Sequence, residues 1–286
     1  MCRFALYLGP DLPIASLITE PSNSIIHQSF HSAEREEPLN GDGFGLCWYV
    51  EGHERPALFK DVSPAWNNLN LHELARVTHT TALLAHVRAA TAGLPVTQLN
   101  CHPFVDGPIS FMHNGTLAGF ARLRKRIIHE ISEEAFARIQ GSTDSEYLFA
   151  IFLDALGVER HAGKEGLDAL SAALEQTVAT AERLRRAIGE ETPSRLNLVA
   201  CDGRVAVACR FVSDGNLPAH SLYVQQGERY GRVGAHVRME APGESHAALV
   251  LASEPLSDNT GWRAISPGHL VELEAGRPWR ERPLAL

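Results

Sequence analysis

The chain has 286 residues, a formal net charge of −8 and 44% hydrophobic residues, a balance typical of a soluble globular protein that buries a large core. An acidic chain whose only basic run is short disfavours nucleic acid and anionic membranes as partners. No segment approaches the ~18 apolar residues that a membrane span needs, and the short apolar stretch after Arg3 is followed by no signal-peptide cleavage site. We therefore expect a cytoplasmic protein.

Strand-like segments occupy both ends of the chain. Apolar runs bounded by Gly, Pro or Asn predict strands over residues 2–8, 43–50, 81–89, 109–113, 196–201, 205–211, 221–225, 247–252 and 270–274. The Asp-Gly pair at 202–203 predicts a two-residue hairpin turn that pairs Cys201 with Arg204 and Cys209 with Leu196. Apolar residues lie on both faces of this hairpin, so we expect its sheet to be covered on both sides.

Helices are predicted mainly in the middle of the chain. Thr143 and Glu146 have the spacing of a capping box, which opens an apolar helix over residues 147–156. Apolar residues at steps of three and four predict a second helix over 166–188. Shorter helices are expected after Pro13 and over 116–128, whereas the Pro- and Gly-containing stretch 227–245 predicts a surface excursion.

The order of these elements favours an α+β fold. Strands, then helices, then strands again differ from the regular alternation of a parallel α/β sheet. We expect two antiparallel sheets covered by helices, which together form a four-layer sandwich. No linker, repeat or low-complexity segment interrupts the sequence, so residues 1–286 are expected to form one domain.

Cys2 stands apart from the other cysteines. The five cysteines contain no CxxC pair and are too scattered for a disulfide framework or a metal site. Removal of Met1 would leave Cys2 with a thiol and a free α-amine on one residue. Because an α-amine has a pKa of ~7.7–8.0, it can act as the base that activates the thiol. The alternative is a second residue that happens to be cysteine.

Short motifs downstream of Cys2 decide between these alternatives. Their residues are Met1-Cys2-Arg3, Asp42-Gly43-Phe44-Gly45, Ala85-His86-Val87-Arg88-Ala89-Ala90-Thr91-Ala92-Gly93, Asn100-Cys101-His102-Pro103-Phe104, His113-Asn114-Gly115, Gly141-Ser142-Thr143-Asp144-Ser145-Glu146 and Ala252-Ser253-Glu254-Pro255-Leu256. In this order they resemble the class II glutamine amidotransferases, which are N-terminal-nucleophile hydrolases. The resemblance spans essentially the whole chain and implies an αββα sandwich.

One departure from the family pattern bears on the substrate. Members fused to synthases usually have Trp and His where this chain has Ala89 and Ala92. The difference resembles the free-standing enzymes that trim γ-glutamyl groups in ergothioneine biosynthesis or glutathione breakdown. Both free glutamine and γ-glutamyl compounds are therefore candidate substrates.

The resemblance implies a catalytic group of three residues. Cys2 is the nucleophile, while the side-chain amide of Asn114 and the backbone N–H of Gly115 stabilise the oxyanion. Glycine suits this position because it lets the backbone approach the reacting atoms closely. The alternative for Asn114 and Gly115 is a simple turn after the strand over 109–113.

The amino-acid head of a γ-glutamyl substrate needs two charged partners. The guanidinium of Arg88 matches an α-carboxylate bidentately, with a structural ion pair as the alternative. Asp144 suits the first turn of its helix, and the resemblance implies that it also binds the α-ammonium. His86 and Thr91 flank Arg88 and are predicted to contact substrate, although His86 could equally be a core histidine.

Three further residues are predicted to line the pocket, namely Gly43, Ser253 and Glu254. A dyad of Cys101 and His102 is not expected, because neighbouring residues on a strand point to opposite faces.

The expected activity is hydrolysis of the γ-amide of glutamine or of a γ-glutamyl compound through a Cys2 thioester, with release of glutamate and ammonia or an amine. No metal ion or organic cofactor is implied. The partner is a small-molecule γ-glutamyl substrate. Two alternatives stay open: a glutaminase subunit that delivers ammonia to a separate acceptor-modifying enzyme, and an inactive relative that binds or regulates.

Overall fold

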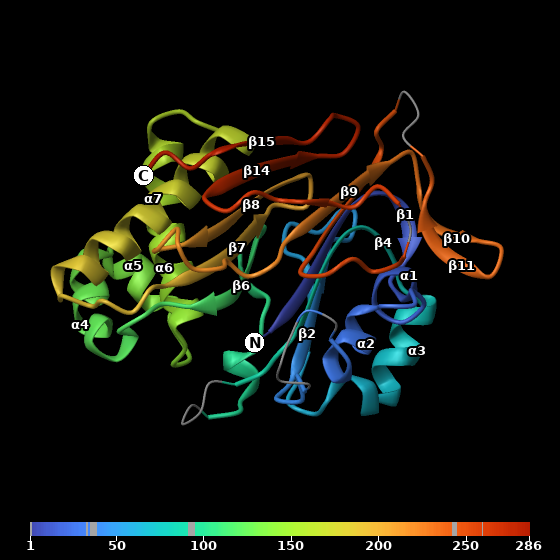
Figure 1. The fold of residues 1–286 in the computed structure, drawn as a ribbon, viewed down its shortest axis with the longest axis horizontal. Coiled ribbons are helices and arrows are strands. Elements are labelled where there is room, and N and C mark those ends of the chain that lie inside the picture. Colours follow the sequence, from blue (N-terminus) through green and yellow to red (C-terminus); the bar gives the residue numbers. More distant parts are fainter. Residues whose placement is uncertain (1, 33, 35–38, 91–94, 242–244, 259) are drawn as a thin grey trace.

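Two stacked antiparallel sheets organise the protein (Figure 1). The computed structural model describes every residue except 1, 33, 35–38, 91–94, 242–244 and 259. The first sheet has the strand order β13 (Arg263–Ala264), β9 (Tyr223–Gly227), β12 (Ala248–Ala252), β1 (Arg3–Pro13), β4 (His79–Val87), β2 (Phe44–Trp48), β3 (Ala57–Asp61). The second has the order β15 (Arg280–Pro283), β14 (His269–Glu274), β8 (Val205–Val212), β7 (Arg195–Cys201), β6 (Ile109–Thr116), β5 (Phe104–Asp106).

Helices form the two outer layers. The first sheet is covered by α1 (Ala15–Ile18), α2 (Ile25–Phe30) and α3 (Leu69–Val77), and the second by α4 (Phe120–Glu130), α5 (Glu133–Ala137), α6 (Asp144–His161) and α7 (Gly166–Ala187). The four-layer αββα sandwich predicted from the order of elements is therefore confirmed. None of the helices in the described part of the chain is long and apolar enough to cross a membrane.

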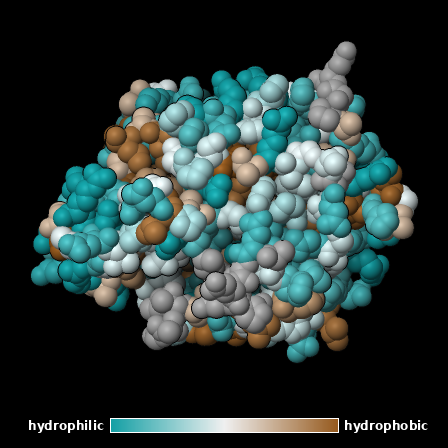
Figure 2. Space-filling model, viewed as in Figure 1, coloured by the Kyte–Doolittle hydropathy of each residue, from teal (hydrophilic) through white to brown (hydrophobic). Residues whose placement is uncertain are grey.

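Three apolar cores separate the four layers. Side chains alternate between the two faces of a strand, so one strand serves two cores. On β1, Phe4 and Leu6 pack in the core between the sheets, whereas Ala5 and Tyr7 pack under α1 and α2. A third core lies between the second sheet and helices α6 and α7. The outer surface seen in Figure 2 is mostly hydrophilic, with hydrophobic residues in small separate patches.

The β7–β8 hairpin has the two apolar faces predicted, but in a different register. Leu198 and Cys209 pack toward α6 and α7, and Val199 and Ala208 pack between the sheets. Cys209 pairs with Leu198 instead of Leu196, and Cys201 pairs with Ala206 instead of Arg204. The turn starts one residue later because the Asp202 carboxylate accepts the N–H groups of Arg204 and Val205, both at 2.9 Å. A shift of two positions leaves each side chain on its predicted face.

The two long helices form where the sequence pattern places them. Thr143 caps α6 by accepting the Glu146 N–H at 3.3 Å. The capping box is nevertheless incomplete, because the Glu146 carboxylate accepts the N–H groups of Gln140 and Gly141 instead of reaching back to the cap.

The stretch 227–245 is only in part the surface excursion that was predicted. It contains a hairpin of β10 (Tyr230–Val233) and β11 (His236–Met239). Tyr230, Val237 and Met239 are buried against the first sheet, and the Tyr230 ring lies 6.2 Å from the Tyr7 ring. The prediction gave weight to turn residues and missed that apolar side chains recur on one face of the hairpin.

Candidate active site

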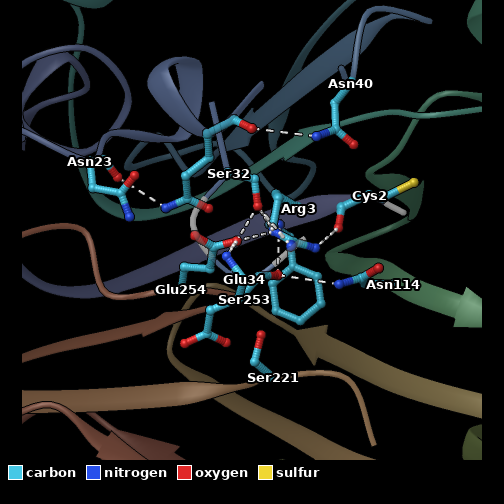
Figure 3. A network of polar contacts seen from close by, with 12 residues as sticks. Cys2, Arg3, Asn23, Ser32, Glu34, Asn40, Asn114, Ser221, Ser253 and Glu254 are labelled. Carbon is cyan, nitrogen blue, oxygen red and sulfur yellow. Dashed lines mark hydrogen bonds and ion pairs between the residues drawn. The ribbon is translucent and has the colours of Figure 1, made fainter. Parts of the chain in front are cut away.

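The start of β1 brings Cys2 to the end of β4. Arg3 pairs with Val87 in the antiparallel ladder, so Cys2 lies beside the residues that follow β4. The Cys2 Sγ lies 3.6 Å from the Ala89 carbonyl oxygen, and its side chain is only half-buried. Figure 3 shows its sulfur directed away from Arg3 and Glu254. A partly accessible thiol at a strand end has the position that a nucleophile needs.

A buried ion pair fixes the backbone next to this thiol. Arg3 and Glu254 are each 1% exposed, with Arg3 Nε donating to Glu254 Oε1 at 2.7 Å. Arg3 Nη1 donates to the Cys2 carbonyl oxygen at 3.0 Å, and Arg3 Nη2 donates to Ser32 Oγ at 2.8 Å (Figure 3). The Ser32 hydroxyl also donates to Glu254 Oε1. The predicted pocket residue Glu254 thus acts through Arg3 on the position of Cys2.

The other sheet contributes Asn114 and Gly115. Both residues belong to β6, where Asn114 pairs with Asn197 and Gly115 with Leu196, so the simple-turn alternative is wrong. Asn114 is buried, and its Nδ2 donates to Ser253 Oγ at 3.4 Å. Ser253 Oγ also accepts the Phe4 N–H at 3.1 Å, which links β6 to β1. The Asn114 amide and the start of β1 therefore share one hydrogen-bonded group.

Gly115 occupies a position where the chain permits no side chain. A Cβ atom there would overlap the carbonyl oxygen of Arg195 on the neighbouring strand β7. The backbone of β6 consequently lies tight against β7 at this residue, and only glycine fits there.

Arg88 is buried but has no acidic partner within the part of the chain described. Its guanidinium donates to the Asp42 carbonyl oxygen at 3.3 Å, and no described carboxylate forms an ion pair with it. Its backbone N–H and C=O bond to Gly43 and Asp42. Gly43 has φ +108°, and a Cβ there would lie 2.7 Å from Cys101 Sγ, so only glycine fits. The ion-pair alternative for Arg88 is not supported.

Asp144 begins α6 and presents its carboxylate to two backbone N–H groups. Oδ1 accepts the Ser145 N–H and Oδ2 the Leu117 N–H, both at 2.8 Å. Its side chain is half-buried. These two bonds fix the orientation of the side chain at the N-terminus of α6.

Three buried histidines lie behind the site. The His86 and His102 rings pack against each other with centroids 4.2 Å apart, and His86 Nε2 lies 3.3 Å from the His113 carbonyl oxygen. Burial lowers the pKa of His86 to about 3 and that of His102 well below its usual range. His86 is therefore a neutral core histidine in this structure. Thr91, the other residue predicted to flank Arg88, lies outside the described residues.

The remaining four thiols are buried. Burial raises the pKa of Cys47 and Cys209 to about 12 and also raises the pKa of Cys101 and Cys201. Cys101 donates to backbone carbonyls and has no bond to His102, so these two residues form no dyad in the described structure. Nor do any three His, Cys, Asp or Glu side chains of the described segments form a group that could hold a metal ion.

Sequence analysis missed two residues that shape this site. Asp42 accepts the Ala90 N–H through Oδ2 at 2.8 Å and so fixes the segment that contacts Cys2. Ser32 completes the Arg3–Glu254 pair. Asp42 opens the Asp42-Gly43 motif and could have been found there, whereas no sequence pattern surrounds Ser32.

The chain is similar to known proteins along almost its whole length. The profile of the family "Glutamine amidotransferases class-II" matches residues 16–283. The probable glutamine amidotransferase DUG3 of Saccharomyces cerevisiae is 34% identical over 96% of this chain and 82% of that protein. A gamma-glutamyl-hercynylcysteine sulfoxide hydrolase of Mycobacterium tuberculosis is 26% identical over 96% of this chain and 93% of that protein.

A solved structure has the same fold along the full chain. The glutamine aminotransferase class-II domain protein from Silicibacter pomeroyi matches with a TM-score of 0.68 at 28% identity, covering 100% of both chains. On the profile match and these relatives, the chain belongs to the class II glutamine amidotransferases and is an enzyme of the kind that acts on amide bonds.

Proposed function

We propose that this enzyme hydrolyses the γ-amide bond of γ-glutamyl compounds, with Cys2 as the nucleophile and residues 1–286 acting as one catalytic domain. One observation carries the proposal. The half-buried Cys2 thiol contacts the carbonyl oxygen of Ala89, the residue that follows Arg88, and Arg88 is a buried arginine with no described acidic partner. A substrate α-carboxylate supplies the missing partner of Arg88. That interaction holds a glutamyl group beside the thiol.

Each step of the reaction has a group to perform it. After removal of Met1, the α-amine of Cys2 takes the thiol proton and Sγ attacks the γ-carbonyl carbon. The Asn114 amide and the Gly115 N–H donate to the oxyanion. The C–N bond then breaks, the proton passes to the leaving amine, and a thioester remains. Water cleaves the thioester and releases glutamate.

Charge complementarity supports the orientation of the substrate. The Arg88 guanidinium donates to the α-carboxylate and the Asp144 carboxylate accepts from the α-ammonium, so the two charged groups of the amino-acid head meet opposite charges. Gly43 and Ser253 border the same region through their bonds to Arg88 and Asn114. We also propose that Thr91 contacts the substrate.

The test compares free glutamine with γ-glutamyl peptides. We expect hydrolysis of γ-glutamyl-glycine to exceed that of glutamine in kcat/KM, measured as glutamate release, on protein whose N-terminus mass spectrometry shows to be Cys2. A subunit that only delivers ammonia to another enzyme would hydrolyse glutamine and leave the peptide intact. An inactive relative would hydrolyse neither.

Covalent labelling tests the nucleophile separately. A diazo-ketone analogue of glutamine should modify Cys2 alone, because the other four thiols are buried. Cys2→Ser should lose activity by several orders of magnitude, whereas the matched control Cys101→Ser should keep both labelling and activity. An adduct mapped to Cys101, or full activity of Cys2→Ser, would contradict the assignment.

A further inference from the structure

A cavity lies beside Arg3, the residue that follows Cys2 in the chain. It encloses about 480 Å³, and the side chains of Arg3, Arg195 and Arg210 line it together with Glu34 and the segment 218–221. Neither Arg88 nor Asp144 lines it, so it is distinct from the region proposed for the amino-acid head. The cavity has no part in the steps described so far.

Strand pairing ties this cavity to the reacting atoms. Arg3 directly follows Cys2 and donates to its carbonyl oxygen. Arg195 precedes Leu196, the residue that pairs with Gly115, and its carbonyl oxygen is the atom that excludes a side chain from Gly115. In Figure 3, Ser221 of the cavity wall lies below Asn114 and Ser253, away from the Cys2 sulfur.

The cavity carries an excess of positive charge. Arg195 and Arg210 form no ion pair with any described carboxylate, unlike Arg3, which Glu254 neutralises. Neutral carbonyl oxygens hold them: Arg210 Nε donates to His220 at 2.8 Å and Arg195 Nε to Pro218 at 3.1 Å. Two guanidinium groups therefore face one carboxylate, Glu34.

Glu34 and His220 leave that excess in place. The Glu34 carboxylate accepts the Tyr223 hydroxyl at 2.5 Å and compensates only one of the two charges. Burial, with Arg195 as the next cause, lowers the pKa of His220 to about 3, so this histidine is neutral at physiological pH. Among the described side chains that line the cavity, Arg195 and Arg210 therefore outnumber the one carboxylate not already paired with Arg3, that of Glu34.

We propose that this cavity binds a carboxylate on the leaving amine, so that the preferred substrates are γ-glutamyl amino acids or peptides with a free C-terminal carboxylate. The proposal rests on the proposed hydrolysis of γ-glutamyl amides. Ammonia would need no such space, whereas 480 Å³ is in the range of small-molecule sites. A planar guanidinium is also the group best suited to bind a carboxylate bidentately.

A matched pair of substrates tests the inference. γ-Glutamyl-glycine and γ-glutamyl-glycinamide differ only in the charge at the end of the leaving group. We expect the wild type to prefer the carboxylate by at least ~10-fold in kcat/KM, the value of one charge-assisted contact. Arg195→Gln, which can still donate to Pro218, should reduce that ratio to near one, and Arg195→Lys should retain part of it.

The control is the same substitution at the other end of the hairpin. Arg204 is exposed at the β7–β8 turn, so Arg204→Gln removes an equal charge far along the strands and should keep the wild-type ratio. Equal hydrolysis of both substrates by the wild type, or an unchanged ratio in Arg195→Gln, would overturn the inference while leaving the proposed function intact. Failure of the wild type to hydrolyse either substrate would instead refute the proposed function.

Discussion

Arg3 and Arg88 are both buried beside Cys2, and their surroundings are opposite. Arg3 is 1% exposed and is satisfied by Glu254, Ser32 and the Cys2 carbonyl oxygen. Arg88 is 3% exposed, and its guanidinium has a single weak bond to a backbone carbonyl. A buried charge is costly unless it is paired. The difference assigns Arg3 to the scaffold, and it is the basis of our proposal that Arg88 binds the α-carboxylate of the substrate.

Removing the scaffold arginine should have the largest effect. Arg3→Met leaves the Glu254 carboxylate buried without its cation, which we expect to lower the free energy of unfolding by about 3–5 kcal/mol. Denaturant titration measures this loss. Arg204→Met, at an exposed turn, is the control and should change stability by less than ~0.5 kcal/mol. If both variants were equally stable, the Arg3–Glu254 pair would not hold the site together.

Arg88, which we propose binds the substrate, should affect kinetics strongly and stability little. Arg88→Gln removes a contact to an unreacting part of the substrate, so kcat/KM should fall ~10–100-fold, mainly through KM. Its stability should change little, because no described ion pair is broken. Steady-state kinetics and unfolding of the same preparation separate the two effects. A large loss of stability with an unchanged KM would place Arg88 in the scaffold after all.

Asp144 is the acidic counterpart of Arg88 in the proposed substrate site. Asp144→Asn removes the charge and should lower kcat/KM by at least ~10-fold for a γ-glutamyl substrate. Discrimination against the matching substrate without the α-amine should collapse. Asn cannot accept both N–H groups that the carboxylate holds, so we also expect a cost of about 1–2 kcal/mol in stability. If Asp144→Asn kept the wild-type discrimination, Asp144 would not bind the α-ammonium, and its role would be limited to the start of α6.

The last prediction concerns pH and the buried histidines. The unfolded chain takes up protons below the ordinary histidine pKa of ~6.5, whereas folded His86 and His102 do not, since burial lowers their pKa. The free energy of unfolding should therefore decrease as pH falls below about 6.5, by up to ~1.4 kcal/mol per pH unit for each histidine. Above that pH these two histidines should not make the free energy of unfolding depend on pH.

His102→Phe isolates this contribution. Both ring nitrogens of His102 lack a described partner, and its ring packs against the rings of His86 and Phe104, so phenylalanine should fit and lose no hydrogen bond. Unfolding measured at pH 7.5, 6 and 5 should show a shallower decline than in the wild type. His53→Phe, at an exposed position, should leave the decline unchanged. An unaltered slope in His102→Phe would mean that this ring is not the source.

The layers and most strands of this fold were predictable because alternation and apolar runs are local properties. The faces of the β7–β8 hairpin were predicted correctly for that reason, but its register was not, since the Asp202 carboxylate reshapes the turn. The β10–β11 hairpin was undervalued because the burial of Tyr230 depends on Tyr7, far away in the sequence.

The candidate site was likewise predictable only in part. Cys2, Arg88 and Asp144 could be named because they stand in recognisable motifs. The contacts that set their geometry could not: Glu254 was predicted only to line the pocket, its ion pair with Arg3 spans 251 positions, and Ser32 has no motif around it. Whether a buried arginine is satisfied by its own chain is a property of the folded structure, so the contrast between Arg3 and Arg88 is absent from the sequence.

The β7–β8 hairpin also raises the question of how the chain fixes its own alignment. Both faces of β7 are apolar and buried, so a slip of one residue would exchange one core for another without exposing anything to water, and hydrophobicity alone would barely oppose it. Asn197 supplies the missing penalty. Its Nδ2 donates to the carbonyl oxygens of His220 and Ser221, bonds that a slipped strand would lose deep in an apolar layer. The Asn197 amide therefore fixes the register of β7, and through strand pairing it fixes the position of Gly115 on β6.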